Sequence, residues 1–138
     1  MTKAFLDTNV FLDLFLDRGE FAEAAETILL WCKNDKLHGF TSTISISNIY
    51  YLLAQQKTKS ETKKIIRSLL DFISVPVTIK KDLVLAIESS FNDFEDAIQY
   101  YSAMNIEGMD YIVTRNTKDF KMSTIAVVTS EEFVKKFA

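Results

Sequence analysis

Three aspartates lie at positions in the sequence from which their carboxylates could support a reaction on a phosphate group. Asp7 directly follows the apolar residues 4–6, Asp96 precedes the apolar run 111–114, and Asp119 follows that run. A carboxylate without a partner is costly in apolar surroundings, and converging carboxylates repel one another until shared protons or a cation relieve them. A hard divalent cation suits such a set, and oxygen ligands suit both Mg²⁺ and Mn²⁺. A cation of this kind lowers the pKa of a bound water and stabilises charge on a transferring phosphate.

The carboxylates also have simple structural interpretations. Asp7 could cap the helix that follows it, because aspartate is a preferred N-cap residue. Asp93 falls in the first turn of an expected helix, where a carboxylate complements the helix dipole. Asp119 could be an ordinary turn residue. Spacing alone therefore leaves both interpretations open.

The other reactive side chains offer little further catalytic chemistry. His38 is the only histidine, Cys32 is the only cysteine, and no glycine-rich phosphate loop is present. We expect His38 to be a surface or strand-end residue and Cys32 to be a small core hydrophobe. A single cysteine excludes an internal disulfide, which fits a reducing cytosol.

The segments that must position these groups alternate between strand and helix patterns. Five segments are expected to be strands: residues 3–6, 37–41, 75–79, 111–114 and 125–128. The last two are continuous apolar runs, as expected of strands that are buried on both sides. Helices are expected after Asp7, at 20–34, after a cap at Ser45 or Ser47, from Ser60, and at 82–91, 92–105 and 131–137. This order predicts an α/β fold, a three-layer α/β/α sandwich with a mainly parallel central sheet. Ligands of such sheets bind beyond the carboxyl ends of the strands, which is where Asp7 and Asp119 are expected.

The helix expected over residues 92–105 is the most informative one. Asn92 and Glu95 have the spacing of a capping box, and Glu95 points well away from Asp96 on the helical wheel. Residues at i, i+3, i+4 and i+7 are expected to form its core face: Phe94, Ala97, Ile98 and Tyr101. A different face is shared by Asp93, Asp96 and Tyr100.

Length and composition favour one globular domain over residues 1–138. The chain is 48% hydrophobic and 25% charged, with few glycines and prolines. The apolar run 10–16 is interrupted by Asp13 and is too short to span a bilayer, so we expect a cytoplasmic protein with no membrane partner. The net charge of −3 argues against binding nucleic acid by charge alone. The basic residues between 57 and 67 form either a solvated helix face or a ridge that contacts phosphates.

Four stretches of the sequence together resemble the PIN domain family. They are residues 7–10 with Asp13, residues 41–42 with 47–52, residues 93–97, and residues 112–116 leading to 119–120. Each stretch is weakly specific alone, but their order and spacing match the family over essentially the whole chain. Within the family, the chain is similar to the small VapC-like toxin nucleases, in a subgroup with asparagine in the second conserved region.

The resemblance implies a compact domain whose parallel sheet carries an acidic site for Mg²⁺ or Mn²⁺. The implied activity is hydrolysis of RNA phosphodiesters by a metal-dependent endoribonuclease. The implied biological role is that of the toxin in a toxin–antitoxin pair. The expected partners are therefore an RNA substrate, an antitoxin protein and a second copy of the chain in a homodimer.

The resemblance also implies roles for particular residues. Asp7 and Asp96 would be metal ligands, and Asp119 with Asn116 would complete the catalytic site after the fourth strand. Two side chains would orient ligands or bound water through hydrogen bonds: Thr114 and Asn9.

Two positions depart from the family pattern. Many members have a glutamate where this chain has Asn48, and many have an aspartate where it has Asn116. The two amides lower the negative charge of the site and should weaken its metal affinity, although Asn48 can still offer a carbonyl oxygen. We expect one tightly held metal ion and a second that is recruited by the substrate phosphate.

Two other functions compete with the nuclease. The first is a PIN-like module that binds RNA or protein without catalysis, which the amides at Asn48 and Asn116 favour. The second is a phosphoryl-transfer enzyme with Asp7 as nucleophile. Such enzymes usually need a second aspartate two residues further on, where this chain has Asn9.

The first helix carries more apolar side chains than a short helix needs: Phe11, Leu12, Phe15 and Leu16. One interpretation is burial inside the domain. The other is an exposed patch for a second protomer or an antitoxin segment.

Overall fold

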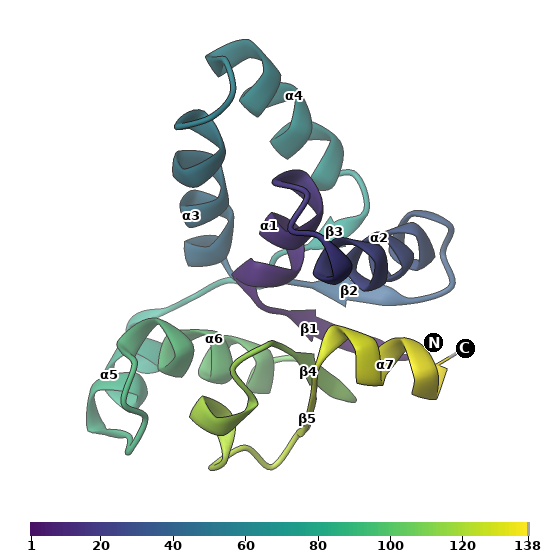
Figure 1. Cartoon of the computed structure of the whole chain (residues 1–138). Helices are drawn as coiled ribbons and strands as arrows, with labels where there is room; N and C mark the ends of the chain where they lie inside the picture. Colours follow the sequence, from purple (N-terminus) through teal and green to yellow (C-terminus); the bar gives the residue numbers. More distant parts are fainter. Residues whose placement is uncertain (138) are drawn as a thin grey trace.

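Strands and helices alternate along the chain in the computed structural model, which describes residues 1–137 (Figure 1). The strands are β1 (Lys3–Leu6), β2 (His38–Phe40), β3 (Ile73–Ser74), β4 (Tyr111–Val113) and β5 (Ala126–Val128). They form a sheet in the order β3-β2-β1-β4-β5, and each of these pairings is parallel. Strands β2 and β3 extend the sheet on one side of β1, and β4 and β5 then extend it on the other side. The reversal of strand order therefore lies between β1 and β4.

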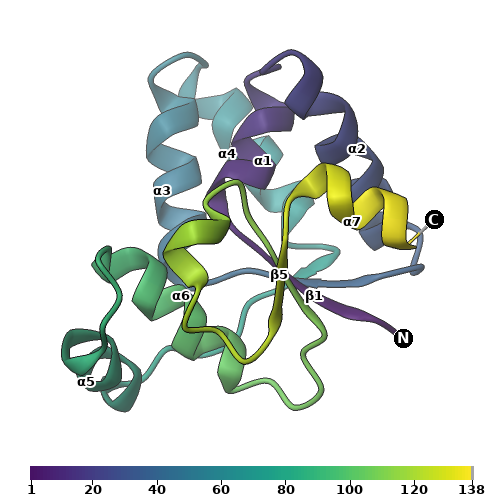
Figure 2. The same ribbon diagram turned by 60° about the horizontal axis from the view of Figure 1, so that its bottom comes forward.

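Helices cover both faces of this sheet (Figures 1 and 2). They are α1 (Thr8–Phe15), α2 (Glu20–Lys33), α3 (Thr43–Ala54), α4 (Lys59–Leu69), α5 (Lys80–Glu88), α6 (Phe94–Met104) and α7 (Ser130–Phe137), with a short 3-10 helix η1 (Thr117–Phe120). Helices α5 and α6 lie on one side, and α1 to α4 lie on the other. The prediction of an α/β sandwich with a parallel central sheet is confirmed.

Alternation along β1 explains how one short strand serves two cores. Ala4 and Leu6 face the larger apolar cluster, which contains buried side chains of α1, α2, α3 and α7. Phe5 points the other way and packs in a second cluster with Tyr100 of α6 and Phe120 of η1. Successive strand side chains point to opposite faces, so β1 holds both helical layers to the sheet.

The strand predicted for residues 75–79 is wrong. Strand β3 ends at Ser74, whose carbonyl oxygen accepts from the Thr41 backbone N–H at 3.0 Å, and residues 75–79 have no regular structure. Pro76 has no N–H to donate to a ladder, and the residue before a proline is also restricted. The ladder therefore stops two residues before the proline.

Two predicted helix caps are also wrong. Helix α3 is capped by Ser42 rather than by Ser45 or Ser47, and the Ser42 hydroxyl accepts from the Ser45 N–H at 3.1 Å. Helix α6 is capped by Asp93 rather than Asn92. An ionised carboxylate complements the positive end of a helix better than an amide does, which favours the aspartate.

The predicted core face of α6 is only partly correct. Ala97 and Ile98 are buried, but Phe94 is exposed and Tyr100 is buried instead. Helix α6 packs against α5 through one apolar cluster and against the sheet through another. Two neighbours therefore give this helix two buried faces, whereas the periodicity argument allowed for one.

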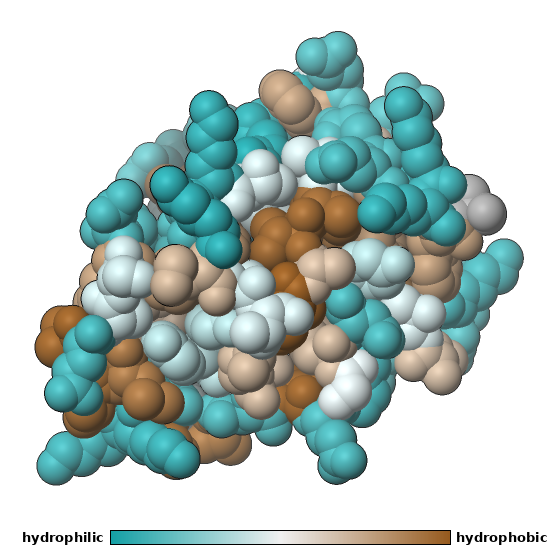
Figure 3. All heavy atoms as spheres, turned by 90° about the horizontal axis from the view of Figure 1, so that it is seen from below, coloured by the Kyte–Doolittle hydropathy of each residue, from teal (hydrophilic) through white to brown (hydrophobic). Residues whose placement is uncertain are grey.

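The apolar side chains of α1 are buried, so the interpretation of Phe11, Leu12, Phe15 and Leu16 as an exposed patch is wrong. Phe11 and Leu12 are inside the core, and Phe15 and Leu16 pack against it. Exposed apolar side chains gather instead over α5, where Leu83, Val84 and Ile87 reach the surface (Figure 3). Among residues 1–137, no helix combines the length and apolar character that crossing a bilayer requires.

Candidate active site

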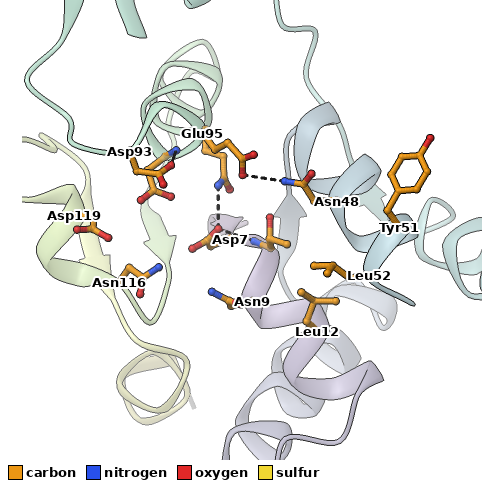
Figure 4. Close-up of a pocket in the computed structure, with 13 residues that line it drawn as sticks. Asp7, Asn9, Leu12, Asn48, Tyr51, Leu52, Asp93, Glu95, Asn116 and Asp119 are labelled. Carbon is orange, nitrogen blue, oxygen red and sulfur yellow. Dashed lines mark hydrogen bonds between the residues drawn. The ribbon is translucent and has the colours of Figure 1, made fainter. Parts of the chain in front are cut away.

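The site lies at the carboxyl ends of the two central strands. Leu6 of β1 pairs with Val113 of β4, so the next residues, Asp7 and Thr114, follow neighbouring strands. This is the point where the strand order reverses, which is where open α/β sheets bind ligands. A pocket of about 490 Å³ opens there (Figure 4). Its lining comprises Asp7, Thr8, Asn9, Leu12, Asn48, Tyr51, Leu52, Asp93, Glu95, Asp96, Gln99, Asn116 and Asp119.

Asp7 is the most firmly held of the acidic residues. It is 3% exposed and caps α1, with Oδ1 accepting from the Thr8 backbone N–H at 2.7 Å. Gln99 Nε2 also donates to Oδ1 at 3.0 Å, and Thr114 Oγ1 donates to Oδ2 at 2.7 Å. The capping interpretation is thus correct, but two side chains from other segments also donate hydrogen bonds to this carboxylate. A buried carboxylate is costly unless such donors satisfy it.

Asp96 approaches Asp7 from helix α6. Its backbone N–H donates to the capping carboxylate of Asp93 at 3.0 Å, which fixes the first turn of the helix. The Asp96 side chain is largely buried. Burial first, and then repulsion from Asp7, Asp93 and Asp119, raises the pKa of the Asp96 carboxyl to about 7. Carboxylates from two other segments are therefore close enough to oppose the ionisation of Asp96.

Asn116 and Asp119 reach the pocket from the segment after β4. The Asn116 backbone N–H donates to Thr114 Oγ1 at 3.0 Å, and the Asp119 N–H donates to the Asn116 carbonyl at 2.9 Å. Thr114 thus links this turn to Asp7. The structure brings all four predicted catalytic residues, Asp7, Asp96, Asn116 and Asp119, to one pocket.

A buried hydrogen-bond network behind Asp7 was missed by sequence reasoning. Ser45 Oγ donates to Gln99 Oε1 at 3.1 Å, and Thr8 Oγ1 donates to Ser45 Oγ at 2.9 Å. The Gln99 amide therefore connects α1 and α3 to the Asp7 carboxylate. Its spacing of three residues from Asp96 places both on one helix face, and this pattern could have identified it.

The helical wheel predicted that Glu95 points away from Asp96 and from the site, but the structure places Glu95 at the pocket. It lines the same pocket as Asp96 and accepts a hydrogen bond from Asn48 Nδ2 at 3.0 Å (Figure 4). This bond joins α6 to α3 at the mouth of the pocket. The amide at position 48 therefore meets a carboxylate on the opposite helix, where a glutamate would meet a like charge.

A buried ion cluster lies beside the pocket. Asp13, which is almost fully buried, is 3.2 Å from Arg115 Nη2 and 3.5 Å from Arg18 Nη1. Arg18 Nη1 also donates to Asn9 Oδ1 at 3.3 Å, and the Arg115 guanidinium lies 4.8 Å from the centre of the Phe21 ring. Burial raises the pKa of the Asp13 carboxyl, while Arg115 and then Arg18 oppose that shift. The cluster ties α1 to the segment that carries Asn116.

The donor set fits a hard divalent cation in its chemistry, because the pocket presents carboxylate and amide oxygens. Within residues 1–137, no three histidine, cysteine, aspartate or glutamate side chains are arranged to hold a metal ion together. His38 and Cys32 lie outside this pocket, as expected, at the start of β2 and in the apolar core.

Comparison with known proteins reveals similarity over nearly the whole chain. A family model described as "PIN domain" matches residues 3–118. Ribonuclease VapC1 of Aquifex aeolicus (strain VF5) is 34% identical over 146 aligned positions, which cover 98% of this chain and 95% of that protein.

Solved structures share the fold at lower sequence identity. VapBC2 from Rickettsia felis, bound to a promoter DNA fragment, matches with a TM-score of 0.64 and 17% identity, covering 92% of this chain and 97% of that one. FitAB bound to an IR36 DNA fragment matches with a TM-score of 0.67 and 16% identity, covering 92% and 94%. A toxin–antitoxin complex from Klebsiella pneumoniae matches with a TM-score of 0.64 and 24% identity, covering 92% and 97%.

Proposed function

The chain belongs to the PIN domain family, and we propose that it is a metal-dependent endoribonuclease that hydrolyses RNA phosphodiesters. The observation that carries the proposal is the meeting of Asp7, Asp96 and Asp119 in one pocket, from three separate segments. The relative named as a ribonuclease, which is similar over nearly the full length of the chain, supports the choice of RNA as substrate.

We assign Asp7, Asp96 and Asp119 as the ligands of Mg²⁺ or Mn²⁺, with Asn116 beside them. When bound, such an ion lowers the pKa of an attacking water and stabilises charge on the phosphate. Asp7 accepts three hydrogen bonds, whereas its two oxygens offer about four acceptor positions, so one remains for a ligand. Thr114 and Gln99 hold this carboxylate in one orientation, which keeps its free position directed consistently.

The charge of the protein makes a cation necessary for substrate binding as well as for chemistry. The net charge is −3, and the pocket itself is lined by five carboxylates: Asp7, Asp93, Glu95, Asp96 and Asp119. An RNA phosphate would be repelled from this surface until the carboxylates are neutralised. The proposal therefore requires that RNA affinity and cleavage both depend on the divalent ion.

The test is cleavage of a mixed RNA pool by the purified protein with Mg²⁺, with Mn²⁺, or with EDTA. We expect cleavage with the metals only, and we expect Asp7→Asn to abolish it while the protein still folds. Asp71→Asn is the matched control, because Asp71 is exposed and does not line the pocket. An Asp7→Asn protein that cuts as fast as the parent would show that the assigned centre is wrong.

A binding module without catalysis is the second candidate, and the amides at Asn48 and Asn116 favour it. A metal that binds only the native state must raise its melting temperature. Absence of any stabilisation by Mg²⁺ or Mn²⁺ would therefore favour this candidate. A phosphoryl-transfer enzyme with Asp7 as nucleophile is not supported by membership of the PIN family.

The proposal extends to partners and context. One of the similar solved structures is a toxin–antitoxin complex from Klebsiella pneumoniae, so we propose an antitoxin as the protein partner and the toxin role for this chain. We also propose a homodimer, one domain over residues 1–138, and a cytoplasmic location. Co-expression with the product of the adjacent reading frame, followed by mass measurement of the complex, tests the antitoxin and the dimer together.

A further inference from the structure

The pocket has two chemically different sides (Figure 4). Asp93, Asp96 and Asp119 lie on the side formed by α6 and η1. The other side is formed by α1 and α3 and carries three neighbouring apolar side chains: Leu12, Tyr51 and Leu52. A cation site explains the first side and leaves the second without a role.

The two α3 side chains on this side lie outside the core of the protein, whereas Leu12 belongs to the core. Helix α3 buries Ser45, Ile49 and Leu53, which recur every four residues on one face. Tyr51 is 66% exposed and Leu52 is 38% exposed, so both lie outside that face. Single exposed apolar residues are ordinary, but these two are adjacent and both line the acidic pocket.

Tyr51 also has a restrained orientation. Its ring centre lies 5.5 Å from that of Tyr50, and the two rings are nearly perpendicular at 85°. Tyr50 itself is partly buried and packs against the main core. An edge-to-face contact of this kind orients the Tyr51 ring, which points away from Asp7 (Figure 4) and leaves aromatic surface exposed at the outer rim of the pocket.

We propose that Tyr51 and Leu52 form a subsite for a nucleobase next to the phosphate that is cut. The inference rests on the proposed ribonuclease function. A nucleotide joins an anionic phosphate to a flat, largely apolar base, and the two sides of the pocket match these two parts. A base can stack on a tyrosine only when it is free of its own helix, so the subsite takes a base from an unpaired stretch of the RNA.

The experiment measures kcat and KM on a short single-stranded RNA whose cut has been mapped with the wild-type protein. Tyr51→Ala should lower kcat/KM about tenfold, mostly through KM, because losing one base–aromatic stack has about this effect. Tyr51→Phe keeps the ring and should cut normally. Ile87→Ala, which removes a comparably exposed side chain (70%) from α5 outside the pocket, should also cut normally.

The same RNA with an abasic nucleotide on either side of the cut identifies the base. At one of the two positions, the wild-type rate should fall about as much as Tyr51→Ala does, and the mutation should cause no further loss. Equal rates for wild type and Tyr51→Ala on intact RNA would overturn the subsite. A Tyr51→Ala loss that persists on both abasic substrates would also overturn it.

Failure of the nuclease itself is distinguishable from failure of the subsite. If the wild-type protein cuts no RNA, the proposed function fails, and the subsite is tested by binding of RNA that contains 2-aminopurine. Quenching of its fluorescence by the wild-type protein but not by Tyr51→Ala would support the subsite, and equal signals would overturn it. If Tyr51→Ala changes only inhibition by a co-expressed antitoxin, the apolar side belongs to a protein partner and the proposal is wrong.

Discussion

The side-chain amide of Gln99 donates to Oδ1 of Asp7 at 3.0 Å, and it does so in the buried interior. Helix α6 thereby holds the carboxylate of Asp7, which directly follows β1, although Gln99 and Asp7 are far apart in the chain. The other end of the same amide accepts from Ser45 of α3. The Gln99 side chain therefore connects α6, α3 and the end of β1 through hydrogen bonds around the proposed metal ligand.

Replacing Gln99 with methionine should impair metal binding more than folding. The change leaves Asp7 without one donor and Ser45 without its acceptor, and loss of such a supporting bond typically lowers metal affinity about 10- to 100-fold. Titration of Mn²⁺ into wild-type and mutant protein measures this directly. Gln56→Met alters an exposed glutamine outside the pocket and should leave affinity unchanged. Equal affinities for Gln99→Met and wild type would remove Gln99 from the site.

Asp96→Asn should stabilise the metal-free protein at pH 8. Burial and neighbouring carboxylates raise the native pKa of Asp96 to about 7, whereas an unfolded aspartate titrates near about 3.9. The native state therefore binds more protons between these values, and wild-type stability is lost as the pH rises through that window. The asparagine removes this penalty, because it carries no charge at any pH.

Thermal melts in EDTA at pH 5 and pH 8 measure the effect of Asp96→Asn. The mutant should melt several degrees higher at pH 8, and the difference should shrink at pH 5, where wild-type Asp96 is protonated. With Mg²⁺ the order should reverse, since the wild type gains binding energy that the mutant lacks. A mutant that is less stable at pH 8 without metal would contradict the repulsion argument.

Asp13→Asn should destabilise the protein and reduce cleavage. The mutation leaves Arg18 and Arg115 without their shared carboxylate, and losing one partner of a partly buried charge pair costs about 1–3 kcal/mol. Arg18 also bonds to Asn9, and Arg115 immediately precedes Asn116, so pocket geometry should suffer as well.

Urea unfolding of Asp13→Asn and Asp71→Asn provides a matched comparison. Asp71 is closer to its arginine partner, at 2.9 Å from Arg67, but its side chain is 65% exposed. Exposed pairs of this type contribute less than about 1 kcal/mol. If the two substitutions destabilise the protein equally, burial of the Asp13 cluster has no energetic consequence.

Placing a carboxylate at position 48 and an amide at position 95 should preserve the hydrogen bond between the two side chains. Changing Asn48 alone should break it. Asn48→Glu places a carboxylate against Glu95 and should lower stability by about 0.5–1.5 kcal/mol through the lost hydrogen bond. Adding Glu95→Gln restores a donor and acceptor pair and returns the pocket to its original charge. A double-mutant cycle measured by thermal melting should show this coupling. Additive effects of the two changes would mean that the bond contributes nothing.

Much of the fold could be predicted from local patterns. Strands β4 and β5 are continuous apolar runs, and the alternation of strands with helices led to the parallel sheet that is observed. Parallel strands place their carboxyl ends at one edge of the sheet, so the sequence alone predicts that Asp7 and Asp119 lie near one another. The resemblance of the motifs to the PIN family added the roles proposed for Asp96 and Asn116.

The sequence by itself determined the fold class, the family and the acidic character of the site, because these depend on residue types, periodicity and order. The tertiary structure decided which polar side chains meet: Gln99 with Asp7, Asn48 with Glu95, and Asp13 with two arginines. Local periodicity could not show that α6 is buried on two faces, nor that Pro76 ends β3 before residue 75. Such contacts join residues distant in the chain, and their geometry exists only once helices from both layers have packed on the sheet.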